Sequence, residues 1–166
     1  VVFAKDNNFY YCPDQQLVIP GQQTSELLNT SNTQFLEFPA KASGNDVFSP
    51  QPSVNDWYDT VKLNYGVDYQ NGSRCFEPIP NTWYKMLDIM TYWCEKGVDG
   101  FRVDMAEMVP VEFWRWSINM LRENYEPIMI AEIYQPHLYK EFIYAGFDYL
   151  YDKVGLYRSE ERRVGK

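Results

Sequence analysis

The sequence is poor in the residues on which many metal and redox sites depend. It has a single histidine and three cysteines (Cys12, Cys75 and Cys94), and the cysteines show no CxxC spacing. An odd number of cysteines without a pattern predicts neither a disulfide framework nor a zinc site, and it leaves the redox compartment open. Lysine and arginine number 15 against 23 aspartates and glutamates, which gives a net charge of −8. Such an acidic chain is not expected to bind nucleic acid, whose phosphates require a basic surface.

Long hydrophobic runs are also missing from the sequence. No stretch reaches the roughly 18 apolar residues of a membrane-spanning helix, so no membrane span is expected in this segment. The composition is otherwise that of a globular protein, with 45% hydrophobic and 23% charged residues. Aromatic residues are plentiful: 14 tyrosines, 10 phenylalanines and 5 tryptophans. Aromatic rings fill ordinary cores and also form sugar-binding platforms, so their number alone does not separate the two uses.

Both ends of the chain indicate a partial sequence. The first residue is Val1 rather than methionine, and no signal peptide follows it. The last nine residues, 158–166 (RSEERRVGK), resemble the conceptual translation of a common sequencing adapter. Residues 158–166 are therefore expected to have no part in the protein's function.

The chain changes character near residue 80. Residues 1–80 hold most of the asparagine, glutamine, serine and proline, with short apolar runs between turns. Among these runs, residues 8–11 and 16–19 predict a hairpin, and residues 34–38 alternate like another strand. The first half is therefore expected to be a loop-rich segment with little core of its own.

The second half alternates regularly between helical and strand patterns. Its expected elements are a helix from Asn81 to Gly97, a strand at 100–104, a helix opening at Pro110, a strand at 128–133, a helix from Pro136 to Gly146 and a strand at 147–151. Alternation of this kind indicates parallel βα units, so residues 81–157 are expected to form an α/β domain.

Two carboxylates fall at the ends of neighbouring strands in this pattern. Arg102 and Asp104 are two residues apart in one strand, so their side chains point to the same face. Glu132 lies in the next strand, among apolar neighbours. In parallel βα folds the carboxyl ends of the strands meet at one edge, and active sites form there. The two acids are therefore expected to face each other.

The surroundings of the two acids predict different charge states. Arg102 is expected to hold Asp104 ionised, which is the state that a nucleophile requires. The apolar neighbours of Glu132 are expected to raise its pKa toward that of a general acid. Carboxyl groups whose pKa values are pushed apart, about 5–5.5 Å from each other, are typical of retaining glycoside hydrolysis. The alternative is a structural ion pair between Arg102 and Asp104, and the presence of Glu132 favours the catalytic interpretation.

At these residues the chain resembles the alpha-amylase family, family 13 of the glycoside hydrolases. The family's fourth strand carries Gly-x-Arg-x-Asp, matched by residues 100–104, and its fifth strand carries an acid/base glutamate, matched by Glu132. The resemblance covers roughly residues 45–157. It implies part of a (β/α)8 TIM barrel, about three βα units, in residues 81–157. It also implies that residues 1–80 are an inserted segment resembling domain B of the family.

The resemblance implies a retaining glycosidase acting on α-glucosidic linkages of starch-like or malto-oligosaccharide substrates. Asp104 is then the nucleophile, oriented by Arg102, and Glu132 is the acid/base. Glu107 and Tyr134 are candidate substrate-binding residues. Two alternatives stay open, an α-glucanotransferase of the same family and a non-catalytic relative that only binds glucan. The chain by itself is expected to be inactive, because the family's third catalytic aspartate and its sugar-binding histidines lie in motifs outside it.

Two positions depart from the family's pattern. A Lys–His pair usually follows the nucleophile by three and four positions, where this chain has Glu107 and Met108. Residues 60–64 (TVKLN) are similar to the family motif Leu-Pro-Asp-Leu-Asn, with Lys62 replacing an aspartate that usually helps to bind calcium. Because a lysine is no ligand for a hard cation, neither calcium nor any other metal or cofactor is expected. A salt bridge between Lys62 and Glu107 is the hypothesis for what replaces the metal.

Overall fold

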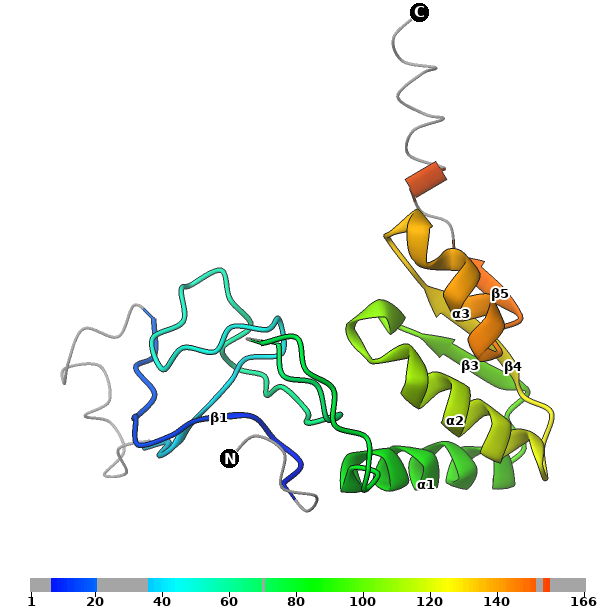
Figure 1. The fold of residues 1–166 in the computed structure, drawn as a ribbon, viewed down its shortest axis with the longest axis horizontal. Coiled ribbons are helices and arrows are strands. Elements are labelled where there is room, and N and C mark those ends of the chain that lie inside the picture. The colour runs from blue at the N-terminus through cyan, green and yellow to red at the C-terminus, as the bar shows by residue number, and fades with distance from the viewer. Residues whose placement is uncertain (1–6, 21–35, 70, 152–153, 156–166) are drawn as a thin grey trace, which may run out of the picture. The chain divides into compact units, whose positions relative to one another are not determined.

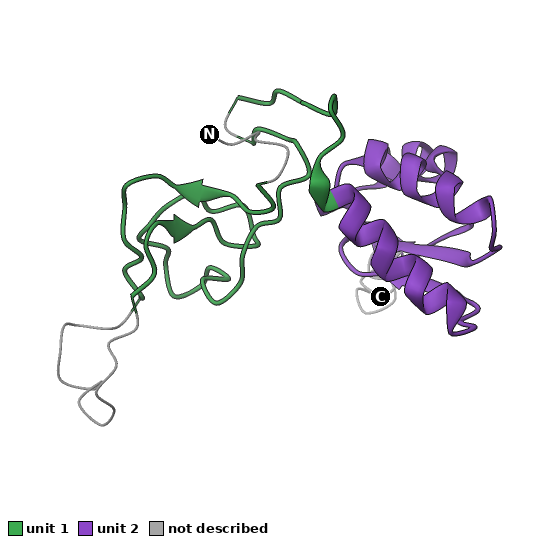
Figure 2. Cartoon of the chain, turned by 90° about the horizontal axis from the view of Figure 1, so that it is seen from below, with its two compact units in different colours: residues 1–82 green, residues 83–166 purple. Residues whose placement is uncertain are grey.

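The computed structural model describes residues 7–20, 36–69, 71–151 and 154–155. The chain divides into two compact units, residues 1–82 and 83–166, which have separate colours in Figure 2. The adapter-like residues 158–166 and the start of the strand expected at 34–38 lie outside the described residues.

The second unit contains a three-stranded parallel sheet (Figure 1). Its strands are β3 (Gly100–Val103), β4 (Ile128–Glu132) and β5 (Tyr149–Tyr151), and they pair in the order β3-β4-β5. Both pairs are parallel. The α/β class and the parallel pairing that the sequence predicts are confirmed.

Helices precede and connect these strands. α1 (Asn81–Glu95) leads to β3, and a short turn, η1 (Ala106–Met108), leads from β3 to α2 (Val111–Arg122). A second turn, η2 (Pro136–Leu138), precedes α3 (Tyr139–Ala145) between β4 and β5. The third helix therefore begins later than expected, because Pro136 opens a 3-10 turn rather than an α-helix.

Gly97 ends α1, as the sequence predicts. It has φ = +85°, a left-handed conformation that a side chain would strain. Its N–H donates to the carbonyl of Cys94 (2.9 Å), and the N–H of Val98 donates to the carbonyl of Trp93 (3.4 Å). This pair of bonds is the Schellman motif, which satisfies carbonyls left without partners at the end of a helix.

The strands alternate between a covered and an open face. On β4, Met129 and Ala131 are fully buried. α2 and α3 pack against each other beside the sheet (Figure 1). α2 contributes an apolar stripe to this core: Val111, Phe113, Trp114, Ile118 and Leu121. The other face carries Arg102, Ile128 and Tyr149, and Ile128 and Tyr149 are 47% and 62% exposed. The unit thus buries one face of its sheet and leaves apolar side chains on the other.

Gly100 is the first residue of β3 and pairs with Ile128 of β4. A Cβ at this position would be 2.1 Å from the carbonyl oxygen of Ile128, a backbone atom that cannot move aside without shifting the strand. Since no side chain fits there, the glycine permits the pairing of Gly100 with Ile128 that begins the register of the two strands.

The first unit is loop-rich, with one short antiparallel pair, β1 (Tyr11–Cys12) with β2 (Ala40–Lys41). Tyr10, which is 1% exposed, packs at its centre. The Tyr10 hydroxyl donates to the carbonyl of Val67 and accepts from the N–H of Val67 (3.1 Å). Burial raises the pKa of Tyr10 to about 12, which keeps this hydroxyl protonated as a donor.

The hairpin expected from residues 8–11 and 16–19 is wrong. β1 pairs with β2, and the N–H of Leu17 donates to the carbonyl of Glu37 (3.0 Å). A partner this far along the chain leaves no local turn signal, so the nearest apolar run was the wrong choice. The interpretation of the two units as a domain B-like insertion and a partial barrel stays a prediction.

No helix among the described residues has both the length and the apolar character needed to cross a membrane.

Candidate active site

The two predicted acids lie side by side at the carboxyl edge of the parallel sheet. In the register of β3 and β4, Arg102 is opposite Ile130 and Val103 is opposite Ala131. Asp104 directly follows β3, and Glu132 is the last residue of β4. Because paired residues of parallel strands point to the same face, both acids lie on the open face.

The Arg102 guanidinium binds both carboxylates. Its Nη1 donates to Oδ1 of Asp104 (2.9 Å), and its Nη2 donates to Oε2 of Glu132 (2.8 Å). The two acids differ in solvent access, since the side chain of Asp104 is 73% exposed and that of Glu132 is 3% exposed. One cation thus holds two carboxylates, one open to solvent and one enclosed.

Two further donors contact Glu132. The hydroxyl of Tyr134 donates to its Oε1 (2.9 Å), and the backbone N–H of Met105 donates to its Oε2 (3.4 Å). Met105 has φ = +46°, in the left-handed region that a residue with a long side chain rarely adopts. Strain of this kind often accompanies functional sites, and here it turns a backbone N–H toward an acid.

The expected rise in the pKa of Glu132 is wrong in direction. A hydrogen bond with Asp104, the bond from Tyr134 and the other contacts lower the pKa of Glu132 to about 2, although burial opposes them. The apolar neighbours in the sequence, Ala131 and Ile133, do not surround the carboxyl group, because alternation places them on the covered face. Glu132 is therefore ionised at neutral pH in the unliganded site.

Glu107 contacts the backbone after β4. Its Oε2 accepts hydrogen bonds from the N–H groups of Tyr134 (3.2 Å) and Gln135 (3.1 Å). A carboxylate in η1 therefore holds the loop that carries Tyr134. The substrate-binding role expected for Glu107 and Tyr134 stays a prediction.

Lys62 lies in the first unit and is 6% exposed. Its Nζ is 2.5 Å from Oδ1 of Asp46 and 4.5 Å from the ring centre of Tyr69. Lys62 is in the first unit and Glu107 in the second, so the salt bridge hypothesised between them stays a prediction.

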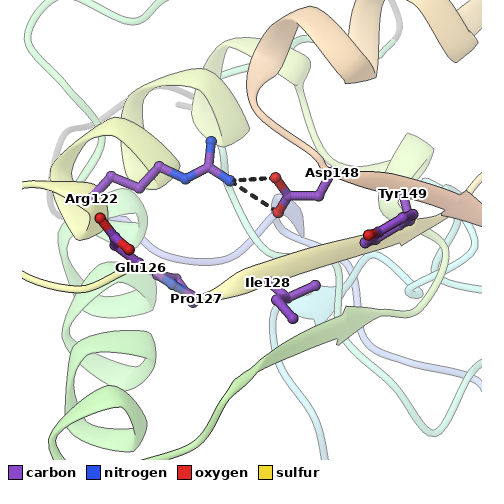
Figure 3. A pocket seen from close by; sticks show the side chains of 6 residues that line it. All are labelled: Arg122, Glu126, Pro127, Ile128, Asp148 and Tyr149. Carbon is purple, nitrogen blue, oxygen red and sulfur yellow. Dashed lines mark hydrogen bonds and ion pairs between the residues drawn. The ribbon is translucent and has the colours of Figure 1, made fainter.

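A hollow lies at the opposite, amino end of the strands (Figure 3). Its lining residues are Arg122, Glu126, Pro127, Ile128, Asp148 and Tyr149. Nη2 of Arg122 is 3.0 Å from both carboxylate oxygens of Asp148, as the dashed lines in Figure 3 mark. Oδ2 of Asp148 also accepts the N–H of Met129 (2.8 Å). These polar groups satisfy one another, so this cluster joins α2, β4 and β5 rather than presenting chemistry.

Sequence reasoning missed Met105. No pattern marks this residue, whose left-handed backbone is visible only in three dimensions. Among the described residues, no cluster of three or more histidine, cysteine, aspartate or glutamate side chains is arranged to hold a metal ion.

Comparison with known proteins gives relatives over part of the chain. No family model matches it. It is 33% identical over 75 residues to an alpha-1,4-glucan:maltose-1-phosphate maltosyltransferase of Cereibacter sphaeroides, and 37% identical over 71 residues to that of Rhodospirillum rubrum. These matches cover 44% and 42% of this chain but 13% and 10% of the relatives. The chain therefore spans about a tenth of the length of the curated relatives it matches.

A solved structure is also similar. A maltogenic alpha-amylase of Thermotoga neapolitana shares 32% identity with the chain, at a TM-score of 0.47. The similarity covers 71% of this chain and 24% of that one.

The parallel sheet defines an α/β protein with two acids paired at its carboxyl edge. The maltosyltransferase relatives support the resemblance to the alpha-amylase family over part of the chain. The catalytic roles of Asp104, Glu132 and Arg102 stay predictions.

Proposed function

We propose that the enzyme containing this chain breaks α-1,4-glucosidic bonds with retention of configuration. The observation that carries the proposal is the pair of carboxylates, Asp104 and Glu132, bound to one guanidinium at the carboxyl edge of a parallel sheet. Retaining glycosidases need two acids close enough to flank one bond, and sharing one Arg102 side chain keeps these two close. The maltosyltransferase relatives support an α-glucan as the substrate.

In the first step of the proposed reaction, Asp104 attacks the anomeric carbon and forms a covalent glycosyl–enzyme bond. The bond to the leaving oxygen breaks, and Glu132 gives that oxygen its proton. In the second step, Glu132 takes a proton from the acceptor, and the acceptor oxygen displaces Asp104. Arg102 orients the attacking carboxylate through its hydrogen bond to Asp104.

Glu132 must gain a proton before the first step, because it is ionised in the unliganded site. The largest cause of its low pKa is the hydrogen bond with Asp104. A sugar entering between the two acids would separate them and remove that cause. Substrate binding would then raise the pKa of Glu132 and prepare it as the acid.

We further infer that β3, β4 and β5 form part of a (β/α)8 barrel, with the open face of the sheet toward the barrel interior. Exposed apolar side chains on that face, such as Ile128 and Tyr149, support this inference. A partial barrel leaves such surface uncovered, so we expect residues 1–157 alone to be inactive and to lack a cooperative thermal transition. Glucan hydrolysis together with a cooperative melt in this segment would contradict the inference.

The acceptor distinguishes the two candidate activities. Water gives hydrolysis, and a sugar hydroxyl gives transfer. The relatives named as maltosyltransferases favour transfer of a maltosyl unit as the second candidate. Incubating the full-length enzyme with an α-1,4-glucan, with and without maltose-1-phosphate, separates them. New reducing ends indicate hydrolysis, and elongated chains with released phosphate indicate transfer.

The two acids are tested by substitution in the full-length enzyme. An α-maltosyl fluoride needs no protonation of its leaving group, so E132Q should lose about 10²–10⁴-fold of kcat/KM, which reports the first step, on glucan but much less of kcat/KM on the fluoride. D104N should lose activity on both substrates, because it lacks the nucleophile. D148N, at the other end of the sheet, is the matched control. Equal losses on both substrates in E132Q would reject the acid/base role of Glu132.

A further inference from the structure

We infer that Glu107 is a positioning residue that fixes Tyr134 so that the Tyr134 hydroxyl bonds to Glu132. The inference rests on the proposed function only where it concerns catalysis. The two-acid mechanism gives Glu107 no chemical step, and the inference assigns it a role in positioning.

The first link is the contact of Glu107 with the backbone. A single oxygen, Oε2, accepts the N–H groups of two successive residues, Tyr134 (3.2 Å) and Gln135 (3.1 Å). Bonds from two adjacent N–H groups to one carboxylate oxygen fix the direction of the chain at this point, which a single bond would not do. The segment held in this way lies directly after β4, between Glu132 and Pro136.

The second link is the contact of Tyr134 with Glu132. Tyr134 is two residues beyond Glu132, and its hydroxyl reaches back to Oε1 (2.9 Å). A phenol side chain has few rotatable bonds, so the position of its hydroxyl follows the position of its backbone. Moving the loop therefore moves the donor away from the acid.

Apart from Tyr134, groups that contact Glu132 come from β3 and the residues directly after it. Arg102 donates to Oε2 (2.8 Å), Asp104 shares a hydrogen bond, and the N–H of Met105 reaches Oε2 (3.4 Å). On β5, Tyr151 is opposite Glu132 in the strand register. Tyr134 binds Oε1 whereas Arg102 binds Oε2, so loss of the Tyr134 hydroxyl changes one side of the carboxyl group and leaves the Arg102 contact in place.

The first measurement does not depend on activity. Hydrogen–deuterium exchange of the peptide containing Tyr134 and Gln135 is compared in the full-length enzyme, in E107M and in E107Q. Methionine keeps the length of the side chain but has no acceptor for these N–H groups, whereas the glutamine amide oxygen accepts them. We expect faster exchange in E107M and near-normal exchange in E107Q. E141Q, on the exposed surface of α3, is the control, and E107A is the second variant if E107M does not fold.

The second measurement is the pH dependence of kcat. Its basic limb reports loss of the proton from the general acid in the enzyme–substrate complex, where the proposed function raises the pKa of Glu132. A hydrogen bond to the ionised form lowers the pKa of a carboxyl group, so removing it should move this limb to higher pH by about one unit. We expect Y134F and E107M to show this shift and E107Q to retain the normal profile. The double variant E107M/Y134F should shift no further than Y134F, because both changes break one connection.

The outcomes separate the inference from the proposed function. Unchanged exchange in E107M overturns the anchoring role of Glu107. Faster exchange with an unmoved basic limb, in an enzyme that E132Q inactivates on glucan, overturns the positioning of Tyr134. If E132Q remains fully active, the proposed function fails, and the exchange measurement alone decides whether Glu107 anchors the loop.

Discussion

The two ends of β4 carry similar side chains and arrange them in opposite ways. At the amino end, Arg122 meets one carboxylate, Asp148, which also accepts a backbone N–H from Met129. At the carboxyl end, Arg102 meets two carboxylates. The guanidinium at the amino end therefore binds one carboxylate, and the guanidinium at the carboxyl end binds two.

This difference shows that an arginine–carboxylate contact is no sign of function by itself. The contact at the amino end links α2 and β4 to the residue before β5, as a structural contact does. The carboxyl end combines an enclosed acid, an exposed acid and the strained backbone of Met105. A surplus of acids around one cation is the feature that indicates chemistry.

The largest expected effect comes from exchanging the arginines for methionine in turn. In the full-length enzyme, R102M should lower kcat on α-glucan by about a thousandfold, because it removes the charge that orients the nucleophile. R122M should leave kcat within about threefold of the wild type, since it lies at the far end of the strand. Similar losses in the two variants would remove the distinction between the two ends.

The next largest expected effect is on how stability changes with pH. The pKa of Glu132 is about 2 in the folded site and about 4.3 in an unfolded chain. A lowered pKa stabilises the folded state fully above about pH 5, and this contribution is lost as the pH falls toward 2. The melting temperature of E132Q should therefore fall less steeply between pH 6 and pH 3 than that of the wild type. Parallel curves would contradict the lowered pKa, and I130V controls for a general loss of stability.

A smaller effect is expected for stability at the amino end. D148A removes the acceptor of the Met129 N–H and the partner of Arg122, so it should lower the free energy of unfolding by about 1–2 kcal/mol. The ion pair itself is partly exposed and contributes about 1 kcal/mol or less. D148N keeps an acceptor oxygen and should lose less. Chemical denaturation with a kcat measurement checks both points, and a large loss of kcat in D148A would indicate an unexpected role for this end.

The smallest expected effect is that of metal removal. Lys62 already pairs with Asp46 in the first unit, so chelation by EDTA should shift the melting temperature of the full-length enzyme by no more than about 1 °C. Adding calcium after chelation is the control. A clear loss of stability with EDTA that calcium restores would show that another group of ligands holds a metal.

The sequence predicted the second unit well because its signals are local. The helical spacing before Gly97, the glycine itself and the alternation of helix and strand patterns all lie within short stretches. The positions of Asp104 and Glu132 followed from the same alternation, since parallel strands bring their carboxyl ends together.

The remaining features depend on contacts between distant residues. The charge state of Glu132 follows from Arg102, Asp104 and Tyr134, and a sequence window shows only its apolar neighbours, which lie on the other face. The partner of β1 was missed for the same reason, since β2 is far along the chain. Glu107 follows β3 and Tyr134 follows β4, so their contact produces no periodic pattern in the sequence.

Gly100 connects the pairing of β3 with β4 to the geometry of the candidate active site. A single added methyl group there would push two strands apart at their start, four residues before Asp104. The displaced strand would carry Arg102 and Asp104 away from Glu132 while leaving every charged side chain in the sequence. The proposed activity could thus be abolished from the opposite end of the sheet, by the volume of one methyl group.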